Sequence, residues 1–156
     1  MLSVKIPGCD PLNLSHLVLD YNGTIAVDGH FIDGVEERLR LLAESLTIHI
    51  LTADTFGSVR EVLAGIPCRL EVIRGGNQAE AKRDYVAQLG LEHCVCIGNG
   101  RNDRLMLKEA TLGIVVVQAE GAAVEAVCAA DIVANSIMEA LDLLSHPLRL
   151  AATLRS

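Results

Sequence analysis

The chain has 156 residues, and its 13 basic and 20 acidic side chains give a formal net charge of −7. This length suits one domain spanning residues 1–156, and a hydrophobic content of 51% excludes a disordered chain. The acidic balance argues against a nucleic-acid-binding protein, because such proteins need Lys and Arg to neutralise phosphates. It leaves small phosphorylated ligands open, since one well-placed Lys or metal ion can outweigh the charge of the whole chain.

The sequence predicts neither a membrane anchor nor an export signal. Met1–Leu14 is interrupted by Lys5 and two prolines, so it lacks the apolar core of a signal peptide. Apolar runs such as Ile114–Val117 have the length of a strand, far below the ~20 residues of a membrane-spanning helix. The cysteines are odd in number and scattered, unlike a secreted disulfide framework. We therefore expect a cytoplasmic protein without a membrane partner. The five cysteines are Cys9, Cys68, Cys94, Cys96 and Cys128.

The first predicted elements are strands. Leu2–Ile6 is a candidate for an extra edge strand, and His16–Tyr21 is the first strand of the main sheet. Thr24–Ile32 contains the Asp28-Gly29 pair, which is a hairpin signal, so we expect a small β-flap after the first strand. Gly34 then precedes a predicted helix. The apolar positions of that helix are Val35, Leu39, Leu42 and Leu46.

The rest of the chain continues the alternation of strands and helices. A helix is expected at Gln78–Leu89, with Gly90 at its C-terminal cap. The spacing of Ile137, Leu141, Leu144 and Leu148 predicts a last helix. Several strands are apolar at nearly every position, as in parallel sheets covered on both faces. The pattern predicts an α/β fold, a Rossmann-like three-layer sandwich around a mostly parallel sheet. The remaining predicted strands are Thr47–Leu51, Arg69–Ile73, His93–Ile97, Ile114–Val117 and Asp131–Ala134.

Polar residues follow directly after the predicted strands, where ligands bind in open α/β sheets. The first strand leads into Asp20-Tyr21-Asn22-Gly23-Thr24, the second into Thr52-Ala53-Asp54, and the fourth into Gly98-Asn99-Gly100-Arg101-Asn102-Asp103. Lys82 lies on the same face of its predicted helix as Val86, and this face should pack on the sheet. A Lys at such a place needs an explanation, although its head could also extend past the apolar face into water.

Together these residue types can perform phosphoryl transfer. Asp20 supplies a carboxylate nucleophile, and Gly23 lets the backbone approach a phosphate and expose its N–H. Thr52 can donate its hydroxyl to a phosphoryl oxygen, and Lys82 can neutralise the charge that develops there. Asp20 and Asp103, on strands expected to be neighbours, can hold Mg²⁺, which prefers oxygen ligands.

The order Asp-x-x-Gly-Thr, Thr, Lys and Gly-Asn-Gly-x-Asn-Asp, from Leu17 to Leu107, resembles the four motifs of the haloacid dehalogenase superfamily. The last motif is similar to that of P-type ATPase phosphorylation domains, and the nearest resemblance is to soluble P-type-ATPase-like hydrolases. The resemblance implies a Mg²⁺-dependent phosphohydrolase or phosphotransferase that acts through phospho-aspartate. It assigns catalysis to Asp20, Asn22, Thr52 and Lys82, phosphate binding to Gly23, Thr52, Ala53 and Lys82, and the metal to Asp20, Asn22, Asp103 and Asn99.

The chain departs from the family pattern in three ways. Asn22 stands where family phosphatases usually have a second Asp as general acid and base, so we expect slow turnover. Asn99 replaces the first Asp of the last motif, and it can offer a carbonyl oxygen but no charge. Only 27 residues separate Thr24 from Thr52, so no cap domain fits between them.

Alternatives remain at this stage. Asn22 and Asn99 are also what a non-enzymatic phosphate-binding or phosphoacceptor module with a decayed site would show. Dinucleotide binding lacks the third Gly of its motif, and Cys94 with Cys96 could form a soft-metal site. The substrate is a small or macromolecular phosphorylated compound, and an uncapped pocket favours a homo-oligomer that covers it. Candidates for the rim of the pocket are Asp54, Arg74, Arg101 and Arg104.

Overall fold

The computed structural model describes residues 1–53 and 58–156. Six strands of these residues form one parallel sheet with the order β10-β9-β8-β3-β6-β7. The predicted α/β fold is confirmed, and each of the six predicted strands of the main sheet is present with ends shifted by one or two residues. The strands are β3 (His16–Asp20), β6 (Thr47–Thr52), β7 (Cys68–Val72), β8 (Cys94–Gly98), β9 (Leu112–Val116) and β10 (Ile132–Ala134).

The strand order reverses at β3, the first strand of this sheet in the chain. From β3 the chain adds β6 and β7 on one side, and β8, β9 and β10 on the other. Leu17, Val18 and Leu19 are completely buried because both faces of this central strand are covered. In a doubly wound sheet the crevice at such a reversal is where ligands bind. The carboxyl ends of β3 and β8 therefore mark the expected site.

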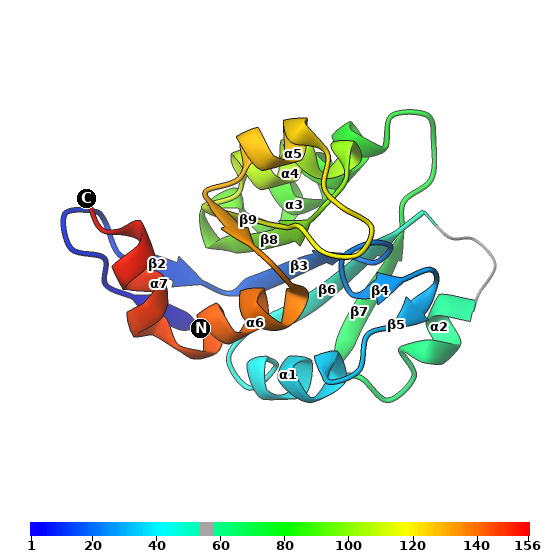
Figure 1. Ribbon diagram of the computed structural model, residues 1–156, viewed down its shortest axis with the longest axis horizontal. Coiled ribbons are helices and arrows are strands. Elements are labelled where there is room, and N and C mark those ends of the chain that lie inside the picture. The colour runs from blue at the N-terminus through cyan, green and yellow to red at the C-terminus, as the bar shows by residue number, and fades with distance from the viewer. Residues whose placement is uncertain (54–57) are drawn as a thin grey trace.

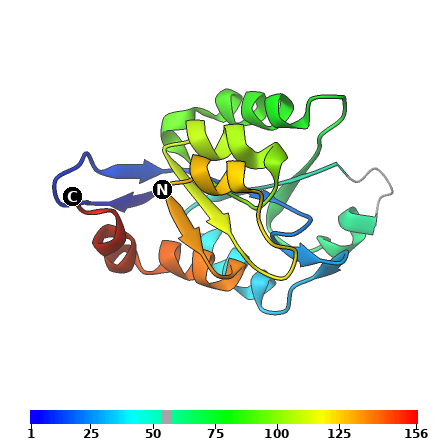
Figure 2. The same cartoon turned by 45° about the horizontal axis from the view of Figure 1, so that its top comes forward.

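Two layers of helices enclose the sheet, as Figure 1 shows. The turned view in Figure 2 gives the same arrangement. The result is the predicted three-layer sandwich. The helices on one face are α3 (Gln78–Leu89), α4 (Arg104–Glu109) and α5 (Val124–Ala129), those on the other are α1 (Val35–Leu42) and α6 (Ile137–Ser145), and the short α2 (Ser58–Val62) follows β6.

The flap after β3 is present as predicted. β4 (Ala26–Val27) and β5 (His30–Phe31) form an antiparallel hairpin. Its two turn residues, Asp28 and Gly29, both have positive φ, at 50° and 76°, which matches the twist of a two-residue hairpin. Apart from this flap, only α1 lies between β3 and β6. No cap domain is inserted in this part of the described chain.

The N-terminal segment differs from its prediction. The expected edge strand is instead β1 (Leu2–Val4), which pairs antiparallel with β2 (Leu12–Leu14) in a separate two-stranded sheet. The turn at Gly8, with φ of 86°, lets the chain fold back on itself. Local pairing of these strands thereby replaces pairing with the main sheet. In Figure 1 this hairpin lies beside the C-terminal helix α7 (Pro147–Leu154).

The end of the chain also corrects the sequence-based expectation. One helix was predicted to include Leu148, but α6 ends at Ser145 and α7 begins at Pro147. Proline has no N–H to donate and suits the first position of a new helix. The break turns Leu148 outward, to 87% exposure, and buries Leu150 in its place. Helix α1 likewise ends before Leu46, which is still buried.

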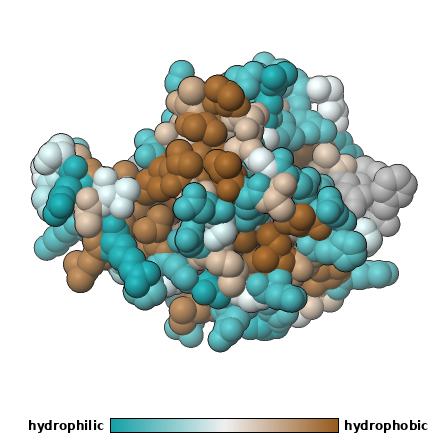
Figure 3. Space-filling model, viewed as in Figure 1, coloured by the Kyte–Doolittle hydropathy of each residue, from teal (hydrophilic) through white to brown (hydrophobic). Residues whose placement is uncertain are grey.

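The two edges of the main sheet have different surfaces. Exposed Arg69 and Glu71 line the β7 edge, whereas Val133 is exposed on β10. Figure 3 shows apolar side chains gathered over α5 and β10, where Val124 and Val133 lie. A homo-oligomer that covers the open site stays a prediction.

No helix of the described residues is long and apolar enough to span a membrane.

Candidate active site

Three charged side chains meet at the carboxyl ends of β3 and β8. Asp20 is the last residue of β3, Asp103 ends the 3-10 helix Arg101–Asp103, and Lys82 lies in α3. The Lys82 Nζ donates to Asp20 Oδ1 at 2.6 Å and to Asp103 Oδ1 at 2.7 Å. Lys82 and Asp103 are fully buried and Asp20 is 7% exposed. We call these three residues the ionic cluster.

The ionic cluster contains one cation for two carboxylates. Burial and the neighbouring Asp103 charge raise the pKa of Asp20 to about 7, although Lys82 opposes both effects. Burial would lower the pKa of Lys82, but the two carboxylates more than offset it, so the net shift is upward. Lys82 therefore stays positively charged. Asp20, the carboxyl group of the ionic cluster that reaches the surface, is the one whose ionised form is disfavoured.

Asp103 is held from both of its carboxylate oxygens. Oδ1 accepts from Lys82, and Oδ2 accepts from the backbone N–H groups of Asn99 at 3.0 Å and Gly100 at 2.8 Å. Gly98 is required here, because a Cβ at this position would lie 2.5 Å from the Asp103 carboxylate. The loop after β8 thus wraps tightly around Asp103. This carboxylate is oriented to hold Lys82 in place.

The turn after Asp20 uses Gly23 differently from the prediction. The Gly23 N–H, expected to face a phosphate, donates to the Ala26 carbonyl at 2.8 Å, because the flap brings this carbonyl back against the turn. Gly23 is still needed, since its φ is 79° and a Cβ would lie 2.4 Å from the Asn99 amide. Ala26 bonds to Tyr21 and Gly23, on either side of Asn22. The N–H and the carbonyl of Asn22 itself therefore point away from Ala26. The residue is exposed.

Thr52 and Ala53 lie at the same edge of the sheet. Asp20 pairs with Leu51 in the register of β3 and β6, so Thr52 is one residue further along. Thr52 is buried, and its carbonyl accepts from the Ile73 N–H at 2.7 Å, whereas Ala53 is exposed. These positions allow both residues to border a phosphate at Asp20. Asp54 lies outside the described residues.

Two side-chain amides brace the turn from the other strands. Asn99 Oδ1 accepts from the Thr24 hydroxyl at 3.3 Å, and its Nδ2 donates to the Gly121 carbonyl at 3.1 Å. Gln118 Nε2 donates to the carbonyls of Gly23 at 3.0 Å and Thr24 at 2.7 Å. The sequence analysis missed Gln118. The rule that sites lie after strands could have found it, because Gln118 follows β9 by two residues.

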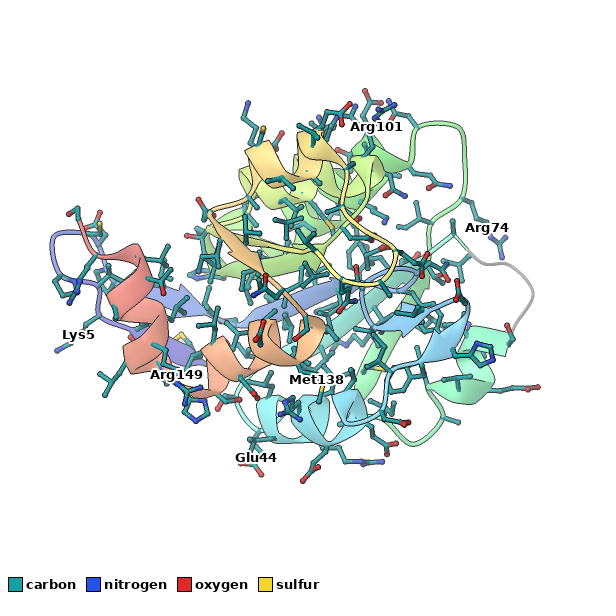
Figure 4. All side chains as sticks on the ribbon, in the orientation of Figure 1. Lys5, Glu44, Arg74, Arg101, Met138 and Arg149 are labelled. Carbon is teal, nitrogen blue, oxygen red and sulfur yellow. The ribbon has the colours of Figure 1, made fainter. Side chains whose placement is uncertain are left out.

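The arginines expected at the rim lie apart from the ionic cluster. Arg101 pairs with Glu125 at 2.9 Å, and Arg104 donates to the Arg101 carbonyl. Figure 4 shows Arg101 on the outer surface of the helical layer and Arg74 near the end of β7. The alternative of a soft-metal site at the cysteines is not supported either, because Cys94 Sγ donates to the Gly90 carbonyl at 3.2 Å. Across the described ranges, no group of three or more His, Cys, Asp or Glu could hold a metal ion.

The predicted Mg²⁺ ligands are therefore unequal. Asp20 reaches the surface and Asn22 is exposed, whereas the oxygens of Asp103 and the amide of Asn99 are occupied by protein contacts. Mg²⁺ in proteins often takes only one or two carboxylates, keeps several waters and shares a substrate phosphate. The donor set fits an ion bound in this way.

Comparison with known proteins gives relatives in sequence and in structure. No protein-family model matches the chain. The uncharacterized protein MJ0073 of Methanocaldococcus jannaschii is 43% identical over 84 residues, which is 51% of this chain and 90% of that protein. The uncharacterized protein MJ0072 of the same organism is 56% identical over 39 residues, which is 25% of this chain and 89% of that protein.

Three solved structures have the same fold. The cobalt-bound deoxy-D-mannose-octulosonate 8-phosphate phosphatase of Haemophilus influenzae has a TM-score of 0.72 and 16% identity, covering 92% of this chain and 94% of that chain. The 3-deoxy-D-manno-octulosonate 8-phosphate phosphatase of Moraxella catarrhalis, in complex with magnesium, phosphate and KDO, has a TM-score of 0.72 and 17% identity, covering 92% and 95%. A HAD superfamily (subfamily III A) hydrolase of Legionella pneumophila has a TM-score of 0.68 and 18% identity, covering 90% and 87%. The chain therefore belongs to the same family as MJ0073 and MJ0072, and its fold is that of the haloacid dehalogenase superfamily.

Proposed function

We propose that the protein is a phosphohydrolase that acts through a phospho-aspartate on Asp20. The observation that carries this proposal is Lys82, a buried cation held between Asp20 and Asp103 at 2.6 and 2.7 Å. A buried Lys costs free energy unless it is paired, and here Asp20, the partner at the end of β3, keeps a small exposed fraction. Neighbours of this fold that are named as phosphatases, two of them solved with cobalt or magnesium, support the same reading.

In the first step an Asp20 oxygen attacks phosphorus in line, forming an O–P bond while the bond from phosphorus to the leaving oxygen breaks. Lys82 neutralises charge on Asp20 and the phosphoryl group, and the Thr52 hydroxyl donates to a phosphoryl oxygen. Mg²⁺, when bound by Asp20 and Asn22, supplies further neutralisation of the phosphoryl oxygens. The leaving group takes its proton from solvent. Water then attacks the phosphorus of the phospho-aspartate, releasing inorganic phosphate and restoring the Asp20 carboxylate.

Asn22 limits the second step in this proposal. Its side chain keeps the size of an Asp and can hydrogen-bond, but it cannot take a proton from the attacking water. A general base at this place is typically worth ~10²–10⁴-fold. The phosphoenzyme should therefore persist. In Asn22→Asp, single-turnover decay of the phosphoenzyme should be faster; unchanged decay with normal folding would remove Asn22 as the cause.

The substrate class in this proposal is a phosphate monoester or an acyl phosphate. An acyl phosphate needs little general acid catalysis, because its carboxylate leaving group is a weak base. It therefore suits a site in which Asn22 cannot donate a proton. Without a cap the crevice is open, which admits small and macromolecular phosphoesters alike. The second candidate, a phosphoacceptor module without turnover, is favoured by Asn22 and by the protein contacts of Asn99.

The experiment incubates the protein with acetyl phosphate or p-nitrophenyl phosphate and Mg²⁺, and follows phosphate release and the mass of the intact chain. We expect slow release and a covalent phosphoryl group on the wild type. Asp20→Asn should lose both, whereas Asp84→Asn, a change at an exposed aspartate of α3, should keep both. A phosphorylated chain without release would favour the phosphoacceptor module. Full activity in Asp20→Asn would overturn the proposal.

A further inference from the structure

The Tyr21–Thr24 turn is held by side chains from two other strand ends. The Gln118 amide donates to the carbonyls of Gly23 and Thr24, and the Asn99 amide oxygen accepts from the Thr24 hydroxyl. Thr24 is completely buried, so these bonds are shielded from water. Backbone bonds to the Tyr21 and Ala26 carbonyls fix the shape of the turn. Asn99 and Gln118 add bonds that join it to the loops after β8 and β9.

Gln118 is anchored at its other end. Its Oε1 accepts from the backbone N–H of Ile137 at 2.9 Å. Ile137 is the first residue of α6 and is completely buried, and N–H groups in the first turn of a helix have no partner within the helix. One side chain thus satisfies the helix end and two turn carbonyls together. This leaves Gln118 little freedom to rotate away from the turn.

Both polar atoms of the Asn99 side-chain amide are also hydrogen-bonded. Its Oδ1 accepts from Thr24 and its Nδ2 donates to Gly121, while its backbone N–H donates to Asp103. Gly23 packs so closely against this amide that no side chain fits between them. An Asp at position 99 could not donate to the Gly121 carbonyl, and it would add a third carboxylate near Asp103. The amide at position 99 therefore matches the contacts that it makes.

We infer that Asn99 and Gln118 are positioning residues that clamp the Tyr21–Thr24 turn, and that Asn99 is committed to this clamp and contributes no metal ligand. The inference rests on the proposed function for its effect on rate, but the clamp itself is a statement about the turn. A turn displaced by about 1 Å would misplace Asn22 relative to a phosphate bound at Asp20. Such a displacement can lower the rate by ~10²-fold. The clamp thus links the loops after β8 and β9 to the chemistry at Asp20.

The first test measures hydrogen exchange of the backbone amides in residues 21–26, with no substrate present. Gln118→Glu keeps the shape and the acceptor but replaces the two donated bonds by repulsion against two carbonyls. We expect exchange in this segment to be at least about tenfold faster in Gln118→Glu and in Asn99→Ala. Asn102→Ala is the matched control, because the Asn102 amide lies in the same loop and donates to Gln78 instead. Unchanged exchange in both clamp variants would overturn the inference.

The second test separates the clamp from a metal role. Binding of Mg²⁺ alone, and of inorganic phosphate with Mg²⁺, is measured by calorimetry for wild type, Asn99→Ala and Gln118→Ala. If Asn99 only positions the turn, both variants should weaken binding by the same factor and lower kcat/KM by about 10–100-fold. A loss of Mg²⁺ affinity in Asn99→Ala that Gln118→Ala does not share would show a ligand and contradict the inference. A wild type without turnover would refute the proposed function, while the exchange experiment would still decide on the clamp.

Discussion

Two polar clusters lie on the same face of the sheet, and they differ in charge. The ionic cluster lies at the carboxyl end of β3. At the other end of β3, His16 Nδ1 is 3.1 Å from His49 Nε2, and His49 Nδ1 is 2.8 Å from the Tyr85 hydroxyl. We call these three residues the histidine cluster. Helix α3 serves both clusters, with Lys82 in one and Tyr85 in the other.

The histidine cluster is neutral. Burial, together with the smaller effects of His16 and Arg69, lowers the pKa of His49 to about 4. His49 is completely buried, yet each of its ring nitrogens has a neutral partner. Both ring nitrogens of His49 are therefore used within the cluster.

The ionic cluster keeps its charges in a setting that is just as dry. Burial and the charge of Asp103 raise the pKa of Asp20, and the single ammonium of Lys82 offsets them only in part. The difference teaches that burial alone does not mark a functional site. A better mark is an ionisable group at a strand end, such as Asp20, whose pKa is shifted because the charges around it are not balanced.

Removing Lys82 should have the largest effect on stability. Lys82→Met leaves two carboxylates buried without a cation, and breaking a buried pair in this way costs about 3–5 kcal/mol. Urea denaturation at pH 7 measures the loss. Lys108→Met, at an exposed lysine of α4, is the control and should change the free energy of unfolding little. Equal stability of the two variants would mean that the ionic cluster is not formed in solution.

Acid should unfold the protein through the histidine cluster. The pKa of His49 is about 4 in the folded chain against an ordinary 6.5, so between these pH values the unfolded state binds the extra proton. Stability therefore falls as pH falls from 6.5 to 4, by on the order of 3 kcal/mol at 1.4 kcal/mol per unit. His49→Gln should remove much of this slope in denaturation curves recorded from pH 7 to 4. An unchanged slope would assign the acid sensitivity to other groups.

Tyr85→Phe should have a smaller effect. It removes the hydroxyl that meets His49 Nδ1 at 2.8 Å and leaves a buried ring nitrogen without its partner. A buried polar atom without a hydrogen-bond partner lowers the free energy of unfolding by about 1–3 kcal/mol. We expect the loss in thermal denaturation at pH 7, with catalytic constants unchanged because the hydroxyl bonds to His49 and not to a member of the ionic cluster. A fall in kcat would contradict the separation of the two clusters.

Asp20→Asn should be the mildest change in stability, and of opposite sign. Because the folded pKa of Asp20 is raised from 3.8 to about 7, wild-type stability falls as pH rises through this window and the ionised group is costly above it. The full shift corresponds to on the order of 4 kcal/mol. Asp20→Asn also breaks one ion pair of Lys82, which offsets most of this gain, so the neutral amide should stabilise the protein by about 1 kcal/mol at pH 8. The gain should disappear towards pH 4. A variant that is less stable than wild type at pH 8 would show that the Lys82 pair outweighs the cost of burial.

Much of the fold follows from local pattern. The six strands of the main sheet, the flap and helix α3 were predicted because apolar periodicity and turn residues such as Asp28-Gly29 act over a few neighbouring positions. The motif residues Asp20, Thr52 and Asp103 were found for a similar reason, since strand ends in a parallel sheet share one edge. The break at Pro147 was missed because the spacing of leucines continued across it.

What only the tertiary structure decided are contacts between residues far apart in the chain. Asp20 and Lys82 are 62 positions apart, and Gln118 reaches a carbonyl 95 positions away. No local pattern states that an amide at position 99 will turn to Thr24, or that His49 will lie against His16 and stay neutral. The sequence by itself determined the sheet and the chemistry available at its edge. The partners of each buried polar atom were decided by packing, because burial forces such atoms to bond with whichever group the fold brings within reach.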